Sequence, residues 1–176
     1  MSVARLSKLK ERYDFSVEWK PFLLGPIFKD QGWNTSPFVI YPAKGEYMWR
    51  DIERLCDKHK ISFNKPSIFP QNGLLMARIA LAASKEAWLD QFILKCFEAN
   101  FVYELDISQT SVVESIFNDL GVSLDWIERG LAAENKQKLR EQTQKAKDSG
   151  IFGAPSFVVN NEVFWGDDRL EDALKW

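Results

Sequence analysis

The side chains of this sequence best suited to catalysis or metal binding are two cysteines and one histidine, and their spacing excludes two common kinds of site. Cys56 and Cys96 form no C-x-x-C motif, so the sequence lacks a dithiol redox site and a zinc knuckle. Each lies in a helical pattern, which favours reduced, packed thiols of a cytoplasmic protein over catalytic ones. His59 lies near the end of a predicted helix, and no metal site can be built around it.

A stretch near the C-terminus offers a different kind of chemistry, because it exposes backbone groups. Residues 150–170 read G-I-F-G-A-P-S-F-V-V-N-N-E-V-F-W-G-D-D-R-L. Residues 156–159 and 163–165 predict two strands, and Asn160-Asn161 predicts the two-residue turn that joins them. The sequence therefore predicts a β-hairpin here.

The residues that flank this hairpin could bind an extended peptide. Ala154-Pro155 is a candidate cis bond, which would turn the backbone groups of Ala154 outward, where a peptide could pair with them. Asp168 has Glu171 three residues on, the capping-box spacing for a last short helix. Any hairpin packed on a helix, with a proline shaping its loop, accounts for the same residues, so the rest of the chain must decide.

The elements that must position these residues are mostly helices. Residues 3–13 predict a short helix, and residues 15–22 alternate apolar and polar side chains as a strand that Pro21 ends. Residues 31–42 form one long loop, a kind of segment that often carries function. Further helices are predicted over residues 47–58, 74–83, 85–100, 108–120, 124–133 and 135–149.

This order of elements predicts a fold of the α/β class. The hairpin and the helices around it resemble the second half of a thioredoxin fold. We predict a thioredoxin-like domain formed by the two ends of the chain, residues 1–44 and 139–176, and an all-α domain inserted between them, residues 45–138.

Composition bounds the class of protein. The 176 residues are 45% hydrophobic and include 7 Trp and 13 Phe, which is enough for one well-buried globular protein. A net charge of −2 gives no reason to expect binding to nucleic acid or to an anionic membrane. No apolar run reaches membrane-spanning length, and the first residues do not read as a signal peptide.

Four stretches, in order along the chain, resemble the family of 2-hydroxychromene-2-carboxylate isomerases and kappa-class glutathione transferases. They are W-K-P-F-L-L-G at residues 19–25, F-K-D-Q-G-W-N at 28–34, Y-P-A-K-G-E-Y-M at 41–48, and F-G-A-P-S-F with F-W-G-D-D-R-L in the hairpin. Trp33 is an extra residue relative to the family pattern. Oxidoreductases of the DsbA type share the overall plan but depend on C-x-x-C.

The resemblance implies a site for glutathione. Asn34 and Lys44 would reach the glycyl carboxylate, Asn34 as a hydrogen-bond donor and Lys44 as a charge partner. Two other interpretations stay open at this point. Lys44 could be a solvated loop lysine, and Asn34 could satisfy the backbone of its own loop.

The C-terminal hairpin would hold the rest of the tripeptide. Ala154, before a cis Pro155, would pair with the cysteinyl part, and Asp167 and Asp168 would face the γ-glutamyl end. The family often has a small polar residue in place of Asp167. Asp168 could instead serve only as a helix N-cap.

We expect a glutathione-dependent isomerase that acts on 2-hydroxychromene-2-carboxylate-type aromatic acids, working as a homodimer. The alternatives are a kappa-type glutathione transferase and a non-catalytic protein that binds glutathione or acts as a scaffold. A redox protein is disfavoured because the chain has no C-x-x-C motif.

The resemblance also implies a catalytic serine that this sequence does not contain. Family members open with a strand and a serine in an S-P-Y-S-type turn, which would fall before Met1. Ser2 and Ser7 lie on the predicted helix, past that turn. We therefore expect this chain to be inactive or impaired, and we expect the sheet to lack its central strand between residues 15–20 and 156–159.

Overall fold

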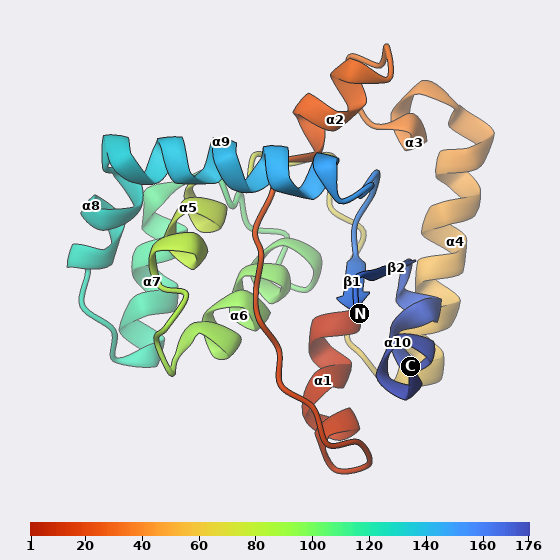
Figure 1. Ribbon diagram of the computed structural model, residues 1–176, viewed down its shortest axis with the longest axis horizontal. Helices are drawn as coiled ribbons and strands as arrows, with labels where there is room; N and C mark the ends of the chain where they lie inside the picture. The colour runs from red at the N-terminus through yellow and green to blue at the C-terminus, as the bar shows by residue number, and fades with distance from the viewer. The chain divides into compact units, whose positions relative to one another are not determined.

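The computed structural model describes residues 1–176, and the chain forms two compact units. The first unit comprises Met1–Val17, Leu24–Ile61 and Gln144–Trp176, and the second comprises Glu18–Leu23 and Ser62–Thr143. The fold is rich in helices and contains one small sheet, which confirms the predicted α/β class (Figure 1). We predicted one domain from residues 1–44 and 139–176 and another from residues 45–138, and these boundaries stay a prediction. In the structure, the first unit is interrupted after Ile61 and resumes at Gln144.

The first unit contains the sheet and the helices that surround it. Its elements are α1 (Ser2–Lys10), α2 (Leu24–Asp30), α3 (Pro37–Ile40), α4 (Pro42–His59), the end of α9 (Ala133–Asp148), β1 (Ser156–Val159), β2 (Glu162–Trp165), the 3₁₀ turn η1 (Asp167–Arg169) and α10 (Leu170–Lys175). Helix α4 begins earlier than the predicted residues 47–58 because Pro42 stands in its first turn, where a proline's missing N–H costs nothing.

The sheet is an antiparallel hairpin of β1 and β2 alone. Asn160 and Asn161 have φ angles of 50° and 66°, the left-handed pair that a tight hairpin turn requires. The turn predicted at these two asparagines is therefore confirmed. Helix α10 packs on the hairpin through Leu170 and Ala173, which are 2% and 3% exposed.

The strand predicted over residues 15–22 is wrong, because this segment joins no sheet. The part of the segment that belongs to the second unit bonds to side chains instead of to a strand. The Trp19 indole donates to Asp90 at 2.6 Å, and directly after the segment the Leu23 amide donates to the Thr143 hydroxyl at 3.1 Å. Alternation of apolar and polar residues predicts an extended chain, but it cannot tell whether another strand lies alongside.

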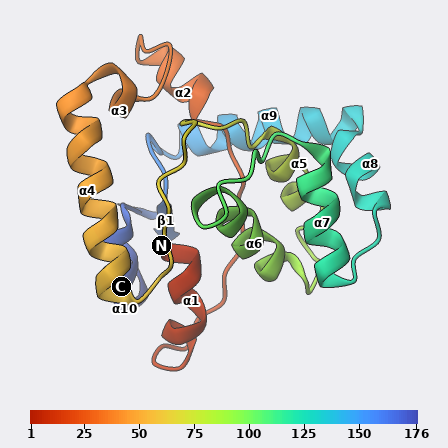
Figure 2. The same cartoon turned by 180° about the vertical axis from the view of Figure 1, so that it is seen from behind.

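The second unit is a helical bundle of α5 (Leu74–Ala82), α6 (Leu89–Phe101), α7 (Thr110–Leu120), α8 (Asp125–Leu131) and the start of α9 (Figure 2). Its core contains the fully buried side chains Ile79, Phe92, Val113, Phe117 and Leu139. The predicted helices of this region are all present, with ends shifted by a few residues. No helix of the structure combines the length and the apolar character needed to cross a membrane.

Candidate functional site

The loop after α2 is shaped by a glycine. Gly32 has a φ of 83°, its amide donates to the Lys29 carbonyl at 3.0 Å, and the Trp33 amide donates to the Phe28 carbonyl at 2.8 Å. This pair of bonds is a Schellman motif, which ends a helix at a left-handed residue. The motif is commonly accompanied by an apolar contact, and here the rings of Phe28 and Trp33 lie 5.9 Å apart. Trp33, the extra residue of the sequence pattern, therefore anchors the loop that carries Asn34.

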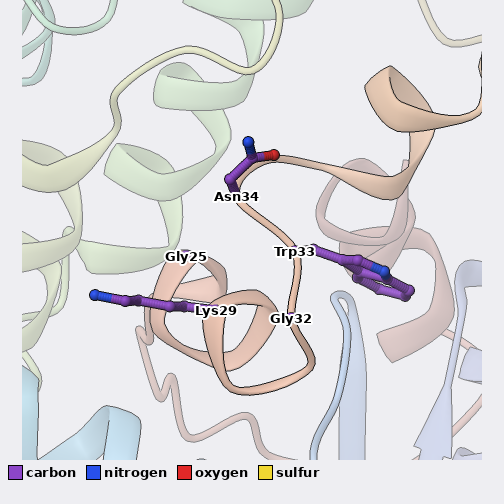
Figure 3. Close-up of a pocket in the computed structure, with 5 residues that line it drawn as sticks. All are labelled: Gly25, Lys29, Gly32, Trp33 and Asn34. Carbon is purple, nitrogen blue, oxygen red and sulfur yellow. The ribbon is translucent and has the colours of Figure 1, made fainter.

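A hollow of about 390 Å³ lies beside this loop (Figure 3). Its lining residues are Gly25, Lys29, Gly32, Trp33 and Asn34. In Figure 3 the Trp33 indole points away from the side on which the Lys29 amine lies. Asn34, one of the residues implied by the family resemblance, thus lies in a concave part of the surface.

Lys44 does not line this hollow, although the resemblance implied that it would act with Asn34. It is exposed in the first turn of α4, with its amine 5.8 Å from the centre of the Phe38 ring. The next residue, Gly45, fixes this geometry, because a Cβ there would lie 2.2 Å from the Phe38 carbonyl oxygen. Only glycine allows α3 to pack this closely on α4.

Lys29 is the lining residue that sequence reasoning missed. Gly25 and Lys29 are four residues apart in α2, so they share one face of the helix. The spacing of Gly25 and Lys29, together with the loop that follows at Asn34, is the sequence signal that could have identified Lys29 as a lining residue. The signal is weak, because most exposed lysines in helices are only solvated.

The Ala154–Pro155 peptide bond is cis in the structure. The Pro155 carbonyl accepts a hydrogen bond from the Gly166 amide at 3.0 Å, which ties this bend to the turn that carries Asp167 and Asp168. Ala154 is exposed, and none of the hydrogen bonds that order this segment involves its backbone. An unbonded backbone amide and carbonyl at the surface can pair with an extended ligand.

The Asp167 carboxylate is already bonded within the chain. The Ser2 hydroxyl donates to one oxygen at 2.7 Å, and the Arg5 guanidinium donates to the other at 3.1 Å. Arg5 also pairs with Glu171 at 2.6 Å. The side chains of Arg5 and Asp167 are only 12% and 10% exposed, so this buried network joins α1 to η1 and α10. Whether Asp167 also contacts a ligand stays a prediction.

Asp168 is different, because its side chain is 68% exposed and pairs only with Arg169 at 3.3 Å. The capping box predicted for Asp168 and Glu171 is wrong. Asp168 lies inside the 3₁₀ turn η1, and α10 starts after Arg169 with no side-chain cap. The box fails because Glu171 turns to Arg5 rather than back to the Asp168 amide. The Asp168 carboxylate is therefore open to solvent and to ligands.

The two cysteine thiols are free but are poor nucleophiles. Burial raises the pKa of Cys56. The nearby N-terminal amine lowers this pKa in part, and the carboxylates of Asp167 and Asp57 raise it by smaller amounts. Burial also raises the pKa of Cys96. Because the thiolate is the reactive form, neither cysteine offers a nucleophile near neutral pH.

The residues implied by the resemblance therefore fall into two groups in the first unit. Ala154, Pro155, Asp167 and Asp168 are held together by the bond between Gly166 and Pro155. Asn34 lies in the hollow, and Lys44 lies against Phe38. One group offers an open backbone and an exposed carboxylate, and the other offers an amide that lines the same hollow as Lys29.

The fold contains a thioredoxin-like hairpin, with helices before and after it in the sequence. A known family has this fold. Residues 3–175 match the model of the DSBA-like thioredoxin domain, so the chain belongs to the DsbA-like thioredoxin family. Among individual proteins it is similar to the 2-hydroxychromene-2-carboxylate isomerase of Sphingobium xenophagum, with 24% identity over 97% of this chain and 87% of the relative. It is also similar to glutathione S-transferase kappa 1 of Rattus norvegicus, with 25% identity over 94% of this chain and 79% of the relative.

A solved structure shares the fold over nearly the whole chain. The selenomethionine form of a 2-hydroxychromene-2-carboxylate isomerase superposes with a TM-score of 0.86, at 23% identity, over 99% of this chain and 87% of that one. The sequence resemblance to this family and the thioredoxin-like fold are therefore confirmed.

Proposed function

We propose that this protein is a glutathione-dependent enzyme, an isomerase acting on aromatic acids of the 2-hydroxychromene-2-carboxylate type. The observation that carries the proposal is the open backbone of Ala154 in the same bend as the exposed Asp168 carboxylate. Glutathione presents a peptide backbone next to an ammonium group, which is the complement of that arrangement. Relatives of this chain named as isomerases and as a glutathione transferase support the assignment.

The first unit has groups for each part of the tripeptide. Ala154 would pair with the cysteinyl backbone, Asp168 would hold the γ-glutamyl ammonium, and Asn34 would donate to the glycyl carboxylate. Asp167 would orient the turn rather than contact the ligand, since both of its oxygens are bonded to α1. When bound, glutathione supplies a thiol.

The raised pKa values of the two cysteines are compatible with a thiol supplied by a bound molecule. Cys56 and Cys96 have raised pKa values because they are buried, so the chain's own thiols cannot supply a thiolate. Glutathione bound in the first unit would supply the reactive thiol in their place.

One observation favours a second candidate function, glutathione binding without turnover. The Ser2 hydroxyl donates its proton to Asp167 at 2.7 Å, so it is not free to stabilise a thiolate. A kappa-type transferase would need such stabilisation as well. Measured turnover decides between catalysis and binding alone.

The test is titration calorimetry with glutathione, followed by an assay of 2-hydroxychromene-2-carboxylate turnover. We expect the variant Asp168→Asn to bind glutathione about five- to tenfold more weakly, because an ammonium loses its charge partner. Asp172→Asn is the matched control, since Asp172 pairs with the same Arg169 and is similarly exposed. Binding without turnover would favour the second candidate, and no binding at millimolar glutathione would end the proposal.

The resemblance also implies a homodimer, which we include in the proposal. Light scattering at micromolar concentration measures it directly. A monomer would contradict this part of the proposal without affecting the assignment of the glutathione site.

A further inference from the structure

Two residues of α1, Ser2 and Arg5, hold the turn η1, which carries Asp168. Arg5 Nη1 donates to the Asp167 carboxylate at 3.1 Å and to the Asp167 backbone carbonyl at 3.4 Å. The Ser2 hydroxyl donates to the other carboxylate oxygen at 2.7 Å. Every oxygen atom of Asp167 therefore accepts a hydrogen bond from α1.

The same guanidinium joins η1 to α10. Arg5 Nη2 donates to the Glu171 carboxylate at 2.6 Å, so one planar group bonds to the turn and to the helix that follows it. The side chains of Arg5 and Asp167 are nearly buried, whereas that of Asp168 is exposed. A planar guanidinium holds its partners in one geometry, which a flexible ammonium does not. Arg5 therefore fixes the orientation of η1 at the start of α10.

The orientation of η1 decides where the Asp168 carboxylate lies. A Cβ added at Gly166 would lie 2.5 Å from Asp168 Oδ1, so the carboxylate lies against this glycine. The Gly166 amide donates to the Pro155 carbonyl at 3.0 Å, in the bend that also contains Ala154. The pair of Asp168 with Arg169 is exposed and contributes little to this arrangement. A rotation of η1 would thus move the carboxylate relative to the Ala154 backbone.

We propose that Arg5 is a positioning residue of the glutathione site, which acts through Asp167 to set the position of the Asp168 carboxylate. The inference rests on the proposed function, in which Asp168 holds the γ-glutamyl ammonium. A charge-assisted hydrogen bond is directional, so its carboxylate must be held in place by the residues behind it. An ion pair between side chains would be enough to attach α1, but the bond to the Asp167 carbonyl also constrains the backbone of the turn.

Calorimetric titration of glutathione into four proteins tests the inference: wild type, Arg5→Lys, Asp168→Asn and the double variant. Arg5→Lys keeps the positive charge beside Asp167 but loses the planar geometry. We expect Arg5→Lys to weaken binding about three- to tenfold in the wild-type background and less than about twofold in the Asp168→Asn background. The second effect is small because Asp168→Asn has already removed the charge that Arg5 positions. Arg12→Lys, at an exposed arginine just after α1 and outside this network, is the control and should bind like wild type.

A second variant tests the same connection without changing a charge. Ser2→Ala removes the other side-chain bond from α1 to Asp167. We expect it to weaken glutathione binding about two- to threefold, and again only where Asp168 is present. Thermal unfolding of each variant measures any general loss of stability, and this loss does not depend on Asp168 if the role is positioning.

The dependence on Asp168 separates positioning from a merely structural role. Equal losses of affinity from Arg5→Lys in the two backgrounds would show that Arg5 only stabilises the first unit, and would overturn the inference. Wild-type affinity of both Arg5→Lys and Ser2→Ala would also overturn it, while the proposed function would stand. If wild type binds no glutathione, both are overturned.

Discussion

At the scale of single residues, glycines set how closely segments of the first unit approach one another. A Cβ at Gly45 would lie 2.2 Å from the Phe38 oxygen, and a Cβ at Gly153 would lie 2.4 Å from the Trp165 indole nitrogen. The first contact is with backbone, which cannot turn aside as a side chain can. Gly45 is therefore the more demanding of the two positions.

We expect Gly45→Ala to lower the free energy of unfolding by about 1–3 kcal/mol, because α3 and α4 must move apart to admit the methyl group. Urea denaturation measures the change. Gly25→Ala is the control, since a Cβ at Gly25 meets nothing within 4 Å. Equal free energies of unfolding for the two variants would contradict this prediction and show that α3 can move away from α4 without loss of stability.

The charged residues show how far single positions can be predicted. Asp168 and Asn34 were found through sequence motifs, and the structure leaves both of them accessible. Asp167 is adjacent to Asp168, yet its carboxylate faces Ser2 and Arg5. Those partners are more than 160 positions away, and no local pattern reports such a contact.

At the scale of elements, α1 is held to η1 and α10 by the Arg5 network. Arg5 pairs with Asp167 where little solvent reaches, and with Glu171, whose side chain is 34% exposed. Removing Arg5 would leave the nearly buried Asp167 carboxylate without its charge partner. The contacts of Arg169 with Asp168 and Asp172 are by contrast exposed.

We expect Arg5→Ala to lower the free energy of unfolding by about 2–4 kcal/mol, and Arg169→Ala to change it by less than about 1 kcal/mol, because exposed pairs contribute little. Chemical denaturation of both variants tests this. Hydrogen exchange should also become faster in α1 of Arg5→Ala. A small effect of Arg5→Ala on both measurements would mean that apolar packing alone holds α1.

The longer helices were predicted well, but α3 (Pro37–Ile40) was missed inside the loop predicted over residues 31–42, and the strands were predicted only in part. The hairpin was found because Asn160-Asn161 is a local turn signal, and helices because their apolar period is local. The predicted strand at residues 15–22 failed because a strand needs a partner elsewhere in the chain. The capping box predicted at the start of α10 was wrong because Glu171 pairs with Arg5, which lies far away in the sequence.

At the scale of the whole molecule, the raised pKa of Cys96 links the free energy of unfolding to pH. The pKa of Cys96 is raised in the folded protein because burial disfavours the thiolate. Below the pKa of the unfolded thiol, both states are protonated and the thiol has no effect. Above it, the unfolded chain loses the proton while the folded one keeps it, so stability falls as pH rises.

We expect the free energy of unfolding of wild type to fall more steeply than that of Cys96→Ala as pH rises from about 8.5 to 10, by up to about 1.4 kcal/mol per pH unit. The comparison is of slopes, because the variant also loses packing at every pH. Urea titrations at several pH values in reducing buffer provide them. Parallel curves would show that the Cys96 thiol ionises as readily in the folded protein.

The discontinuous composition of the two units bears on how the protein is made. The first unit draws on the chain up to Val17, then on Leu24–Ile61, and again from Gln144 onward. On a ribosome, Ser2 and Arg5 leave the exit tunnel long before Asp167, which is 165 positions after Ser2. At usual rates of synthesis this interval is on the order of ten to thirty seconds. During that time the Arg5 side chain of α1 lacks its partner Asp167, so the first unit cannot close until residues more than 160 positions later have been translated.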